Sequence, residues 1–329
     1  MFCEGSIVKG EKMFKSGFIA LVGRTNVGKS TLMNRLIGQK VAITSNKPQT
    51  TRTSIRTILT EERGQMIFID TPGIHKIEHK LGEHMEDAAK RTLSEADVVL
   101  WLVEPSKKTG EGDARVSQLL KGSNAKKVLV INKIDTVPRT ELPRLIEMYK
   151  PLADFDEVVP VSAVTGENEE ELKDVIFDLM DEGPMYYDED ELTDQPLKQI
   201  AAELVRENAL KFLKDEVPHG IAVCVDLMKE RAIGGGYVEY DENEDTVSGE
   251  GAGIFDIEAS IICERDSHKG IIIGKQGSML KKIGTAARLE MEAFMGCRIF
   301  LKLFVKVRKD WRDSEMFLKD YGFAAPKDK

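Results

Sequence analysis

Eight consecutive residues near the start of the chain have the types and spacing needed to hold the phosphates of a nucleotide. Gly23 to Ser30 reads GRTNVGKS, which fits the pattern GxxxxGK[ST] between a predicted strand at 18–22 and a predicted helix. Glycines let backbone N–H groups wrap a phosphate, Lys29 supplies charge to the β- and γ-phosphates, and the Ser30 hydroxyl can ligate Mg²⁺. A chance glycine-rich turn is the alternative, which the strand–loop–helix context disfavours. The expected phosphate-binding residues are Gly23, Arg24, Thr25, Asn26, Val27, Gly28, Lys29, Ser30 and Thr31.

A second motif indicates that the base is guanine. The sequence NKID follows the apolar run 128–131, at the carboxyl edge where parallel sheets bind ligands. The Asp135 carboxylate can accept both the N1–H and the N2–H₂ of guanine, a donor pair that adenine lacks, and Lys133 can lay its stem over the base. Another predicted strand ends at a backbone N–H suited to guanine O6. The expected base-binding residues are Asn132, Lys133, Ile134, Asp135, Ser162 and Ala163.

Two further segments are predicted to sense the γ-phosphate. The sequence DTPG ends the third predicted strand, so Asp70 could hold Mg²⁺ through water and the Gly73 N–H could bond the γ-phosphate. An ordinary DxPG turn is the alternative for this motif taken alone. The site then includes Asp70, Thr71, Pro72, Gly73 and Ile74. A polar stretch before it, here called switch I, could close over Mg²⁺ through Thr50 or Thr51, and the residues leave that choice open; it comprises Gln49, Thr50, Thr51, Arg52 and Thr53.

The residue after Gly73 predicts slow catalysis. Many GTPases place a water-orienting Gln there, whereas this chain has Ile74, which cannot position water by hydrogen bonding. Water would be the nucleophile, with Lys29 and Mg²⁺ stabilising the developing charge. Three histidines follow at spacings of four and five, which could suggest metal ligands. Solvated residues of a mobile segment are favoured instead, because no carboxylate–cysteine set accompanies His75, His79 and His84.

The order of elements predicts two domains after an N-terminal extension at 1–16. Six apolar strands alternate with amphipathic helices over residues 17–183, at 18–22, 54–59, 66–69, 98–103, 128–131 and 158–161. Continuous β-branched runs of this kind indicate strands covered on both faces, hence a doubly wound, mostly parallel α/β domain. Residues 184–196 carry a run of acids and few apolar residues, which is typical of a linker. The remaining residues, 197–329, no longer alternate regularly, which predicts an α+β domain with a C-terminal tail.

The second domain contains the loop GKQG, which favours RNA binding. Glycines at both ends of such a loop let the backbone approach nucleic acid, as in a KH module, although a plain helix–turn–helix turn fits this loop equally well by itself. Residues 264–313 carry twelve basic and six acidic side chains, a balance of +6, and on the last strand Lys302, Lys306 and Arg308 are expected to share one face. Few aromatic residues occur there, so base stacking is not expected to dominate. The predicted RNA-binding residues are Ile273, Gly274, Lys275, Gln276, Gly277, Lys281, Lys282 and Arg288.

Composition bounds the remaining possibilities. The 329 residues carry 47 basic and 56 acidic side chains, a net charge of −9, so the chain outside 264–313 carries −15. A uniform excess of acid would argue against nucleic acid, but this charge is polarised. The four cysteines are scattered, which predicts reduced thiols in a cytosolic protein rather than a disulfide or zinc site. No apolar run approaches the ~18 residues that a membrane span needs.

These motifs together resemble the Era family of bacterial GTPases, which act in small-ribosomal-subunit assembly. The resemblance covers nearly the whole chain and rests on GRTNVGKS at 23, PQTTR at 48, DTPG at 70, NKID at 132, VSA at 161, GIIIGKQG at 270, KKIG at 281 and LFVKVRKDWRDSE at 303. Thr25 departs from the Pro that is usual there. The acidic tip 241–245 is longer than usual, and residues 1–16 form an extension that the family does not share.

The resemblance implies a GTPase that binds the 3′ end of 16S rRNA and the 30S subunit and acts in rRNA maturation. It implies GTP or GDP with Mg²⁺, and a hypothesis that Asn26 holds a catalytic K⁺. Peripheral contact with the inner face of the membrane is left open, and no obligate protein partner is indicated. Nucleotide state would act on the KH domain through residues 40–53 and 74–86. The alternatives are an RNA-binding assembly scaffold with nucleotide as a structural ligand and negligible turnover, and, less favoured, a tRNA-modifying relative.

Overall fold

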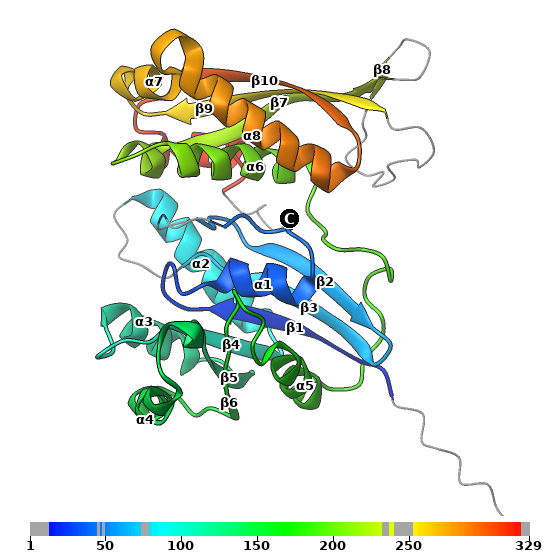
Figure 1. The fold of residues 1–329 in the computed structure, drawn as a ribbon, viewed down its shortest axis with the longest axis vertical. Helices are drawn as coiled ribbons and strands as arrows, with labels where there is room; N and C mark the ends of the chain where they lie inside the picture. Colours follow the sequence, from blue (N-terminus) through cyan, green and yellow to red (C-terminus); the bar gives the residue numbers. More distant parts are fainter. Residues whose placement is uncertain are drawn as a thin grey trace, which may run out of the picture.

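The chain folds into two stacked units, a doubly wound α/β unit below and an α+β unit above (Figure 1). The computed structural model describes residues 13–44, 47, 50–73, 79–231, 253–323 and the backbone of 237–239. Gln49, Ile74, His75 and the acidic tip 241–245 therefore lie outside the described residues, as do residues 1–12.

The lower unit is a six-stranded sheet with helices on both faces. Its strand order is β2-β3-β1-β4-β5-β6, in which only the β2–β3 pair is antiparallel. The strands are β1 Lys15–Val22, β2 Ile55–Glu61, β3 Gly64–Asp70, β4 Val98–Val103, β5 Lys126–Ile131 and β6 Glu157–Pro160. The helices are α1 Lys29–Ile37, α2 Lys80–Glu95, α3 Glu111–Leu120, α4 Leu142–Tyr149 and α5 Glu169–Leu179. This is the doubly wound, mostly parallel arrangement predicted from the sequence.

Alternation within each strand explains why the sequence shows continuous apolar runs. Leu100 and Leu102 of β4 enter the core beside α1 and α5, whereas Val99 and Trp101 enter the core beside α3 and α4. Because helices cover both faces, every residue of β4 is buried. The parallel strands therefore present their carboxyl ends, and the loops that follow them, at one edge.

The sheet begins earlier than expected. Lys15 and Ser16 pair with Gly64 and Gln65 of β3, so the last two residues of the predicted N-terminal extension belong to β1. The Lys15 ammonium also donates to the carbonyl of Phe177, 2.7 Å away. These bonds extend the strand beyond the apolar run that predicted it.

The upper unit is a four-stranded sheet in the order β10-β9-β7-β8. Its strands are β7 Ala222–Arg231, β8 Tyr237–Glu239, β9 Ile254–Cys263 and β10 Arg298–Val307, with β10 parallel to β9 and β7 antiparallel to it. Helices α6 Leu197–Phe212, α7 Asp266–Ile273 and α8 Ser278–Met295 pack against one face and complete the core. A C-terminal segment, η6 Trp311–Asp313 and α9 Glu315–Asp320, covers part of the other face through Ala222 and Ile262.

Helix α6 lies between the upper sheet and the lower unit (Figure 1). The segment that joins the two units also follows the edge of the lower sheet. Gln65 accepts hydrogen bonds from the backbone N–H groups of Tyr186 and Tyr187, and the Ile58 N–H donates to the carbonyl of Leu192. The described part of the chain contains no helix long and apolar enough to cross a membrane.

Candidate nucleotide site and RNA groove

The phosphate loop connects β1 to α1 with a backbone that only certain residues adopt. Gly28 precedes α1 at φ +98°, and a Cβ there would lie 2.4 Å from the side-chain nitrogen of Asn132. Gly23 has φ +152°, and a Cβ there would lie 2.4 Å from the carbonyl oxygen of Leu102. Both glycines are therefore required by close backbone approach as well as by φ. The loop remains free to turn its N–H groups toward a phosphate.

Lys29 is held beneath this loop. Its ammonium donates to the carbonyls of Gly23 and Arg24, at 3.3 and 3.2 Å, and the side chain is 7% exposed. Burial lowers the pKa of Lys29, and the charge of Asp70 opposes that shift only in part. Among the described residues this buried ammonium donates to carbonyls, which makes it a strong site for an anion, because a phosphate would supply a counter-charge.

Ser30, Thr51 and Asp70 meet directly below the loop. Asp70 accepts hydrogen bonds from the hydroxyls of Ser30, at 2.6 Å, and Thr51, at 2.9 Å, and the two hydroxyls lie 3.1 Å apart. The second carboxylate oxygen of Asp70 is buried and has no hydrogen-bond partner. Burial raises the pKa of Asp70, outweighing the charge of Lys29 and the two hydroxyl donors. Such a cluster of oxygens with one unsatisfied carboxylate fits a hard divalent cation.

Thr50 points elsewhere. Its hydroxyl donates to the carbonyl of Lys47, 2.7 Å away. The two candidate threonines that the sequence left open therefore differ in the structure, because only Thr51 joins Ser30 and Asp70 in the cluster.

The DTPG segment is fixed against both β1 and the phosphate loop. The Thr71 hydroxyl donates to the carbonyl of Leu21, 2.6 Å away, which directs that side chain into the sheet rather than toward a ligand. A Cβ on Gly73 would lie 2.7 Å from the Thr25 methyl group, so the two loops are in contact. Thr25 therefore leaves no gap beside Gly73.

The predicted guanine-binding residues converge as well. Ser162 donates to the Asp135 carboxylate at 2.6 Å, which orients that carboxylate. Asn132 donates to the carbonyl of Val27 and accepts from the N–H of Ala163, at 2.9 and 3.0 Å, so it ties the base-binding loops to the phosphate loop. Its side chain therefore supports the site without facing the base.

Lys133 and Ile134 differ in what they contact. Lys133 adopts the left-handed backbone and pairs with Glu104 at 2.5 Å, while Ile134 is buried in the core. Arg24 turns its guanidinium away toward Asp113, 3.2 Å from it, at the start of α3. The side chains of Arg24 and Ile134 therefore face Asp113 and the core, not the nucleotide cavity.

A cavity of about 350 Å³ joins these parts, lined by Thr25, Asn26, Gly28, Lys29, Ser30, Thr31, Thr44, Thr50, Thr51, Gly73, Lys133 and Val164. Sequence reasoning missed Thr44 and Val164, which belong to no recognisable motif. It also missed Glu207 of α6, which is fully buried, accepts from the backbone N–H of Thr44 at 3.3 Å and pairs with Lys40 at 2.7 Å. A buried charge within an amphipathic helix leaves no periodic signal that would reveal it.

The histidines that were expected to be solvated contact the C-terminal segment instead. His79 lies 3.0 Å from Asp313, and His84 lies 3.1 Å from Glu315. The two side chains remain 35% and 24% exposed, so these contacts add to partial solvation, and the sequence could not show them because they come from the upper unit. Among the described residues no group of three His, Cys, Asp or Glu side chains could hold a metal ion. The three described cysteines, Cys224, Cys263 and Cys297, are free thiols.

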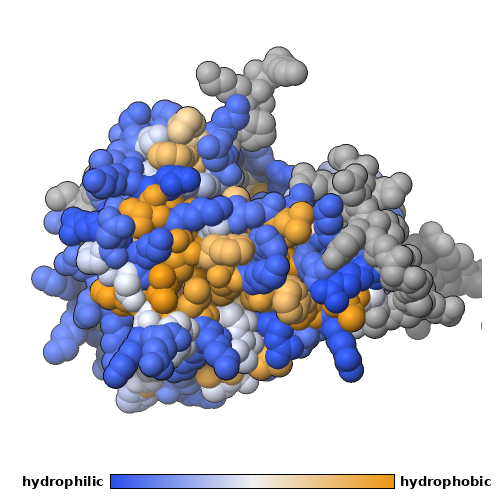
Figure 2. Space-filling view, turned by 90° about the horizontal axis from the view of Figure 1, so that it is seen from above, coloured by the Kyte–Doolittle hydropathy of each residue, from blue (hydrophilic) through white to orange (hydrophobic). Residues whose placement is uncertain are grey.

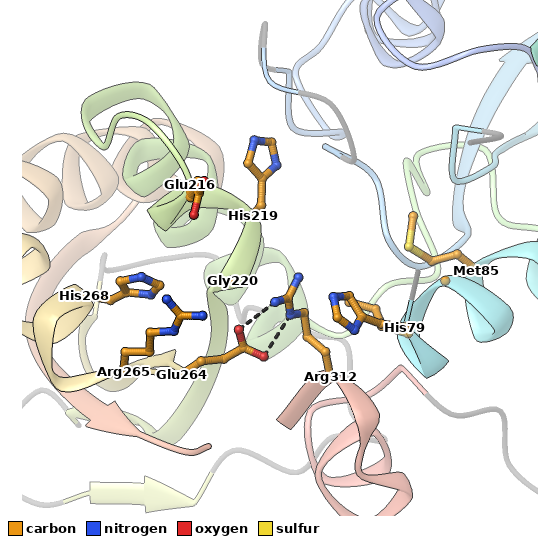
Figure 3. Close-up of a pocket in the computed structure, with 11 residues that line it drawn as sticks. His79, Met85, Glu216, His219, Gly220, Glu264, Arg265, His268 and Arg312 are labelled. Carbon is orange, nitrogen blue, oxygen red and sulfur yellow. Dashed lines mark hydrogen bonds and ion pairs between the residues drawn. The ribbon is translucent and has the colours of Figure 1, made fainter. Parts of the chain in front are cut away.

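A second cavity, of about 380 Å³, lies at the junction of the two units (Figure 3). Within it Arg312 and Glu264 form a two-pronged pair at 2.9 and 2.6 Å, between His268 and Arg265 on one side and His79 on the other. Because Glu264 neutralises Arg312, the cavity is polar without a strong excess of either charge. It separates α2 from the loops at the ends of β7 and β9.

The GKQG loop opens a groove in the upper unit. Gly274 and Gly277 have φ of +72° and +77°, and Gln276 between them also has positive φ. The groove, about 360 Å³, lies between α8 and β10 and is lined by Gly277, Leu280, Lys281, Gly284, Thr285, Arg288, Leu301 and Leu303. Lys275 and Gln276 are exposed beside it. Lys282 lies outside the groove, with its ammonium 4.3 Å from the ring of Phe212.

The opposite face of the upper sheet carries the lysines of β10, as the alternation predicted, but it is not a basic surface. Lys302 pairs with Glu258 at 2.9 Å and Lys306 with Asp226 at 3.0 Å. The same face exposes Phe300 and Phe304, aromatic residues whose exposure the sequence reasoning did not anticipate. Figure 2, which looks down on the upper unit, shows hydrophobic side chains gathered at the centre and hydrophilic ones around them.

The fold and the site define a class: a P-loop GTPase domain followed by a KH domain. Residues 18–133 match the family described as 50S ribosome-binding GTPase, and residues 240–312 match the KH domain family. The chain is 50% identical to GTPase Era of Thermoanaerobacter sp. (strain X514) over 95% of its length and 98% of that protein. It is 47% identical to GTPase Era of Clostridium botulinum (strain Eklund 17B / Type B), over 94% and 99%. The chain belongs to the Era family of GTPases.

Solved structures agree with this family. A crystal structure of Era in complex with MgGDPNP and nucleotides 1506–1542 of 16S ribosomal RNA matches with a TM-score of 0.85 and 38% identity, covering 95% of this chain and 100% of that one. Aquifex aeolicus Era bound to GDP and AlF4⁻ matches with the same TM-score, identity and coverage. The order of GTPase and KH domains is therefore common to all of them.

Proposed function

We propose that this chain is a GTP-hydrolysing switch that binds the 3′ end of 16S rRNA and acts in 30S assembly and rRNA maturation. The observation that carries the proposal is the meeting of Ser30, Thr51 and Asp70 beneath a phosphate loop, in a chain that also presents a GXXG groove. An Era bound to MgGDPNP and 16S rRNA nucleotides supports the same pairing of ligands. The proposed domain division is 17–183 for GTP binding, 184–196 as linker and 197–329 for RNA.

Six residues would bind the nucleotide and its Mg²⁺. Lys29 would neutralise the β- and γ-phosphates, the Gly73 N–H would bond the γ-phosphate, and Asp135 would select guanine. Ser30 and Thr51 would hold Mg²⁺ directly, with Asp70 acting through water. The ion would supply charge stabilisation to the transferring phosphate.

Substituting the two threonines separately tests this assignment. Thr51→Ala should lower the affinity for GDPNP in Mg²⁺ by about tenfold, because one ligand of the ion is lost, while leaving GDP affinity nearly unchanged. Thr50→Ala is the matched control and should preserve the GDPNP-to-GDP affinity ratio. Fluorescent-nucleotide titration measures both. An unchanged ratio in Thr51→Ala would remove Thr51 from the metal site.

For RNA, the proposed contacts are the GXXG backbone, Lys275 and Lys281. Arg288 lines the same groove but already pairs with Glu292 at 2.7 Å, so its role would require exchange of partners. Apolar Leu301 and Leu303 on the facing strand suit unstacked bases better than a closed duplex. Lys282 is left out of this proposed surface because it packs on Phe212.

A K⁺ requirement is part of the proposal. Asn26 lines the nucleotide cavity and adopts φ +65°, which turns the loop at the place where a monovalent ion could assist Lys29. Single-turnover hydrolysis should be faster in KCl than in NaCl of equal ionic strength. Equal rates would reject the ion's role and leave nucleotide binding intact.

Two alternatives are separated by direct measurement. An RNA-binding scaffold with nucleotide as a structural ligand would bind GTP and RNA but release no phosphate. Peripheral contact with the inner face of the membrane would appear as co-sedimentation with anionic vesicles in low salt.

A further inference from the structure

We propose that the KH domain orders switch I by contacts on both sides of Thr51: Arg206 binds the backbone carbonyl of Thr50, and KH-domain carbonyls bind the Arg52 side chain. Thr51 then reaches the Mg²⁺ cluster only while the two domains are docked. The inference rests on the proposed role of Thr51 as a Mg²⁺ ligand. It makes Arg52 and Arg206 positioning residues for hydrolysis.

Arg52 follows Thr51 directly and enters the KH domain. Its guanidinium donates to the carbonyls of Ile221, at 2.5 Å, and His219, at 3.0 Å. The carbonyl between them, on Gly220, accepts from the Trp311 indole at 3.0 Å, and the Trp311 ring lies 5.8 Å from the Arg52 guanidinium carbon. Arg52 is 3% exposed. A buried G-domain side chain thus makes its hydrogen bonds to KH-domain carbonyls.

Arg206 makes the reciprocal contact. It comes from α6 of the KH domain, is 1% exposed, and donates to the carbonyl of Thr50, the residue before Thr51. Glu203, one turn earlier on α6, accepts from Arg206 at 2.8 Å and fixes its direction. The residues on either side of Thr51 are therefore both held by the partner domain, while Thr51 itself faces Ser30 and Asp70.

Docking buries the charge of Arg52, and this burial opposes docking. Burial, and next the charge of Arg206, lower the pKa of Arg52 to about 9, and among the described residues the guanidinium donates to carbonyls. The anchoring segment also borders open space, because His219 and Gly220 line the cavity at the domain junction (Figure 3). A segment beside a cavity can move at lower cost than one packed all round.

A reciprocal effect on RNA follows. If docking favours the ordered switch I that Mg²⁺ and a γ-phosphate require, then a γ-phosphate favours docking by the same factor. The RNA affinity of the KH domain should then differ between GDPNP and GDP, provided that RNA prefers one arrangement of the domains. Substituting Arg52 or Arg206 would remove this difference in RNA affinity without altering the GXXG groove.

The test compares Arg52→Leu with wild type in Mg²⁺, using full-length protein and fluorescent GDPNP and GDP. The expected result is a GDPNP affinity about tenfold weaker with GDP affinity unchanged, because two hydrogen bonds from a charged group are lost. Arg52→Lys should recover part of the loss. Arg56→Leu is the matched control, since Arg56 pairs with Glu95 of α2 and with Asp194 of the joining segment, both outside the KH-domain residues 197–329. Its affinity ratio should equal that of wild type.

Two further variants and an RNA titration separate failure of this inference from failure of the proposed Mg²⁺ site. Arg206→Met, on the other domain, should produce the same loss, and it replaces Arg52→Leu if that variant melts below the assay temperature. The difference in 3′-terminal 16S oligonucleotide affinity between GDPNP and GDP should also vanish. A folded Arg52→Leu with an unchanged affinity ratio overturns the inference when Thr51→Ala lowers the ratio. If Thr51→Ala also leaves the ratio unchanged, the proposed Mg²⁺ assignment fails instead.

Discussion

Asp135 is the residue on which nucleotide choice depends. The Ser162 hydroxyl donates to its carboxylate, 2.6 Å away, and so limits the directions that the carboxylate can take. Asp135→Asn replaces one acceptor by a donor, so GTP affinity should fall by about 10- to 100-fold while xanthine nucleotides, which reverse the donor pattern, gain. Competition between GTP and XTP measures the shift. Unchanged preference would mean that the base is read elsewhere.

Gly28 and Gly38 allow a matched test of the phosphate loop, because they flank the same helix. Gly28→Ala places a Cβ 2.4 Å from Asn132, the residue that ties the loop to the base site, and should reduce GTP affinity at least tenfold. At Gly38, φ is +76° but nothing lies within 4 Å, so Gly38→Ala should cost only about 1 kcal/mol of stability. Nucleotide titration and thermal melting separate the two effects. Equal GTP affinities would contradict the close contact.

At the scale of single residues, the sequence could predict the residues of contiguous motifs and little else. Lys29, Ser30, Asp70 and Asp135 stand in spacings that their chemistry requires. The choice of Thr51 over Thr50 depends on the path of an irregular loop, which local pattern does not determine. Arg206 and Glu207 lie on a helix whose neighbours come from the other domain, so no property of the helix alone reveals their contacts.

Among the elements, the GXXG turn makes the clearest prediction. Gly277 has φ +77° with open space around its Cα, whereas a Cβ on Gly274 would lie 2.7 Å from Met279. Gly277→Asn suits the left-handed backbone and adds a side chain at the mouth of the groove. We expect unchanged melting temperature and RNA affinity weakened about tenfold, measured by oligonucleotide titration. Full RNA affinity would place the bound RNA away from this loop.

Strands and helices were largely predictable because their periodicity reflects burial. The β4 boundaries agree with the apolar run predicted at 98–103, since every residue of that strand is buried. The character of the outer face of β10 was not predictable. Whether Lys302 and Lys306 form a basic surface depends on Glu258 and Asp226, which other strands bring beside them.

At the scale of the whole molecule, charge pairs between domains predict acid-induced separation. Glu290 of α8 bridges Lys40 of the G domain, at 2.7 Å, and Lys211 of α6. Burial alone would raise the pKa of Glu290, but hydrogen bonds from both lysines outweigh it and leave the pKa below its ordinary 4.5. The pair therefore stabilises docking above about pH 4.5 and is lost as the pH falls below that value.

Small-angle X-ray scattering from pH 7 to pH 4 measures this effect, with circular dichroism to follow secondary structure. The radius of gyration should rise before helicity is lost, and Glu290→Gln should raise the pH at which it does so. Constant dimensions down to global unfolding would show that these pairs do not hold the domains together.

The polarised charge of the chain also acquires a structural meaning. The +6 of residues 264–313 belongs to the domain that carries the GXXG groove, while acidic residues dominate elsewhere, so repulsion would disfavour RNA on the rest of the molecule. RNA and nucleotide sites then lie on separate domains, joined by the contacts around Thr51.

The measurement that tests the account most directly is phosphate release under single-turnover conditions, with and without a 3′-terminal 16S rRNA oligonucleotide. The account predicts slow release by the protein alone, a changed rate with the oligonucleotide, and none above background for Lys29→Ala. Background release by the wild type in both conditions, despite tight binding of GTP and RNA, would contradict it and leave the assembly scaffold as the function.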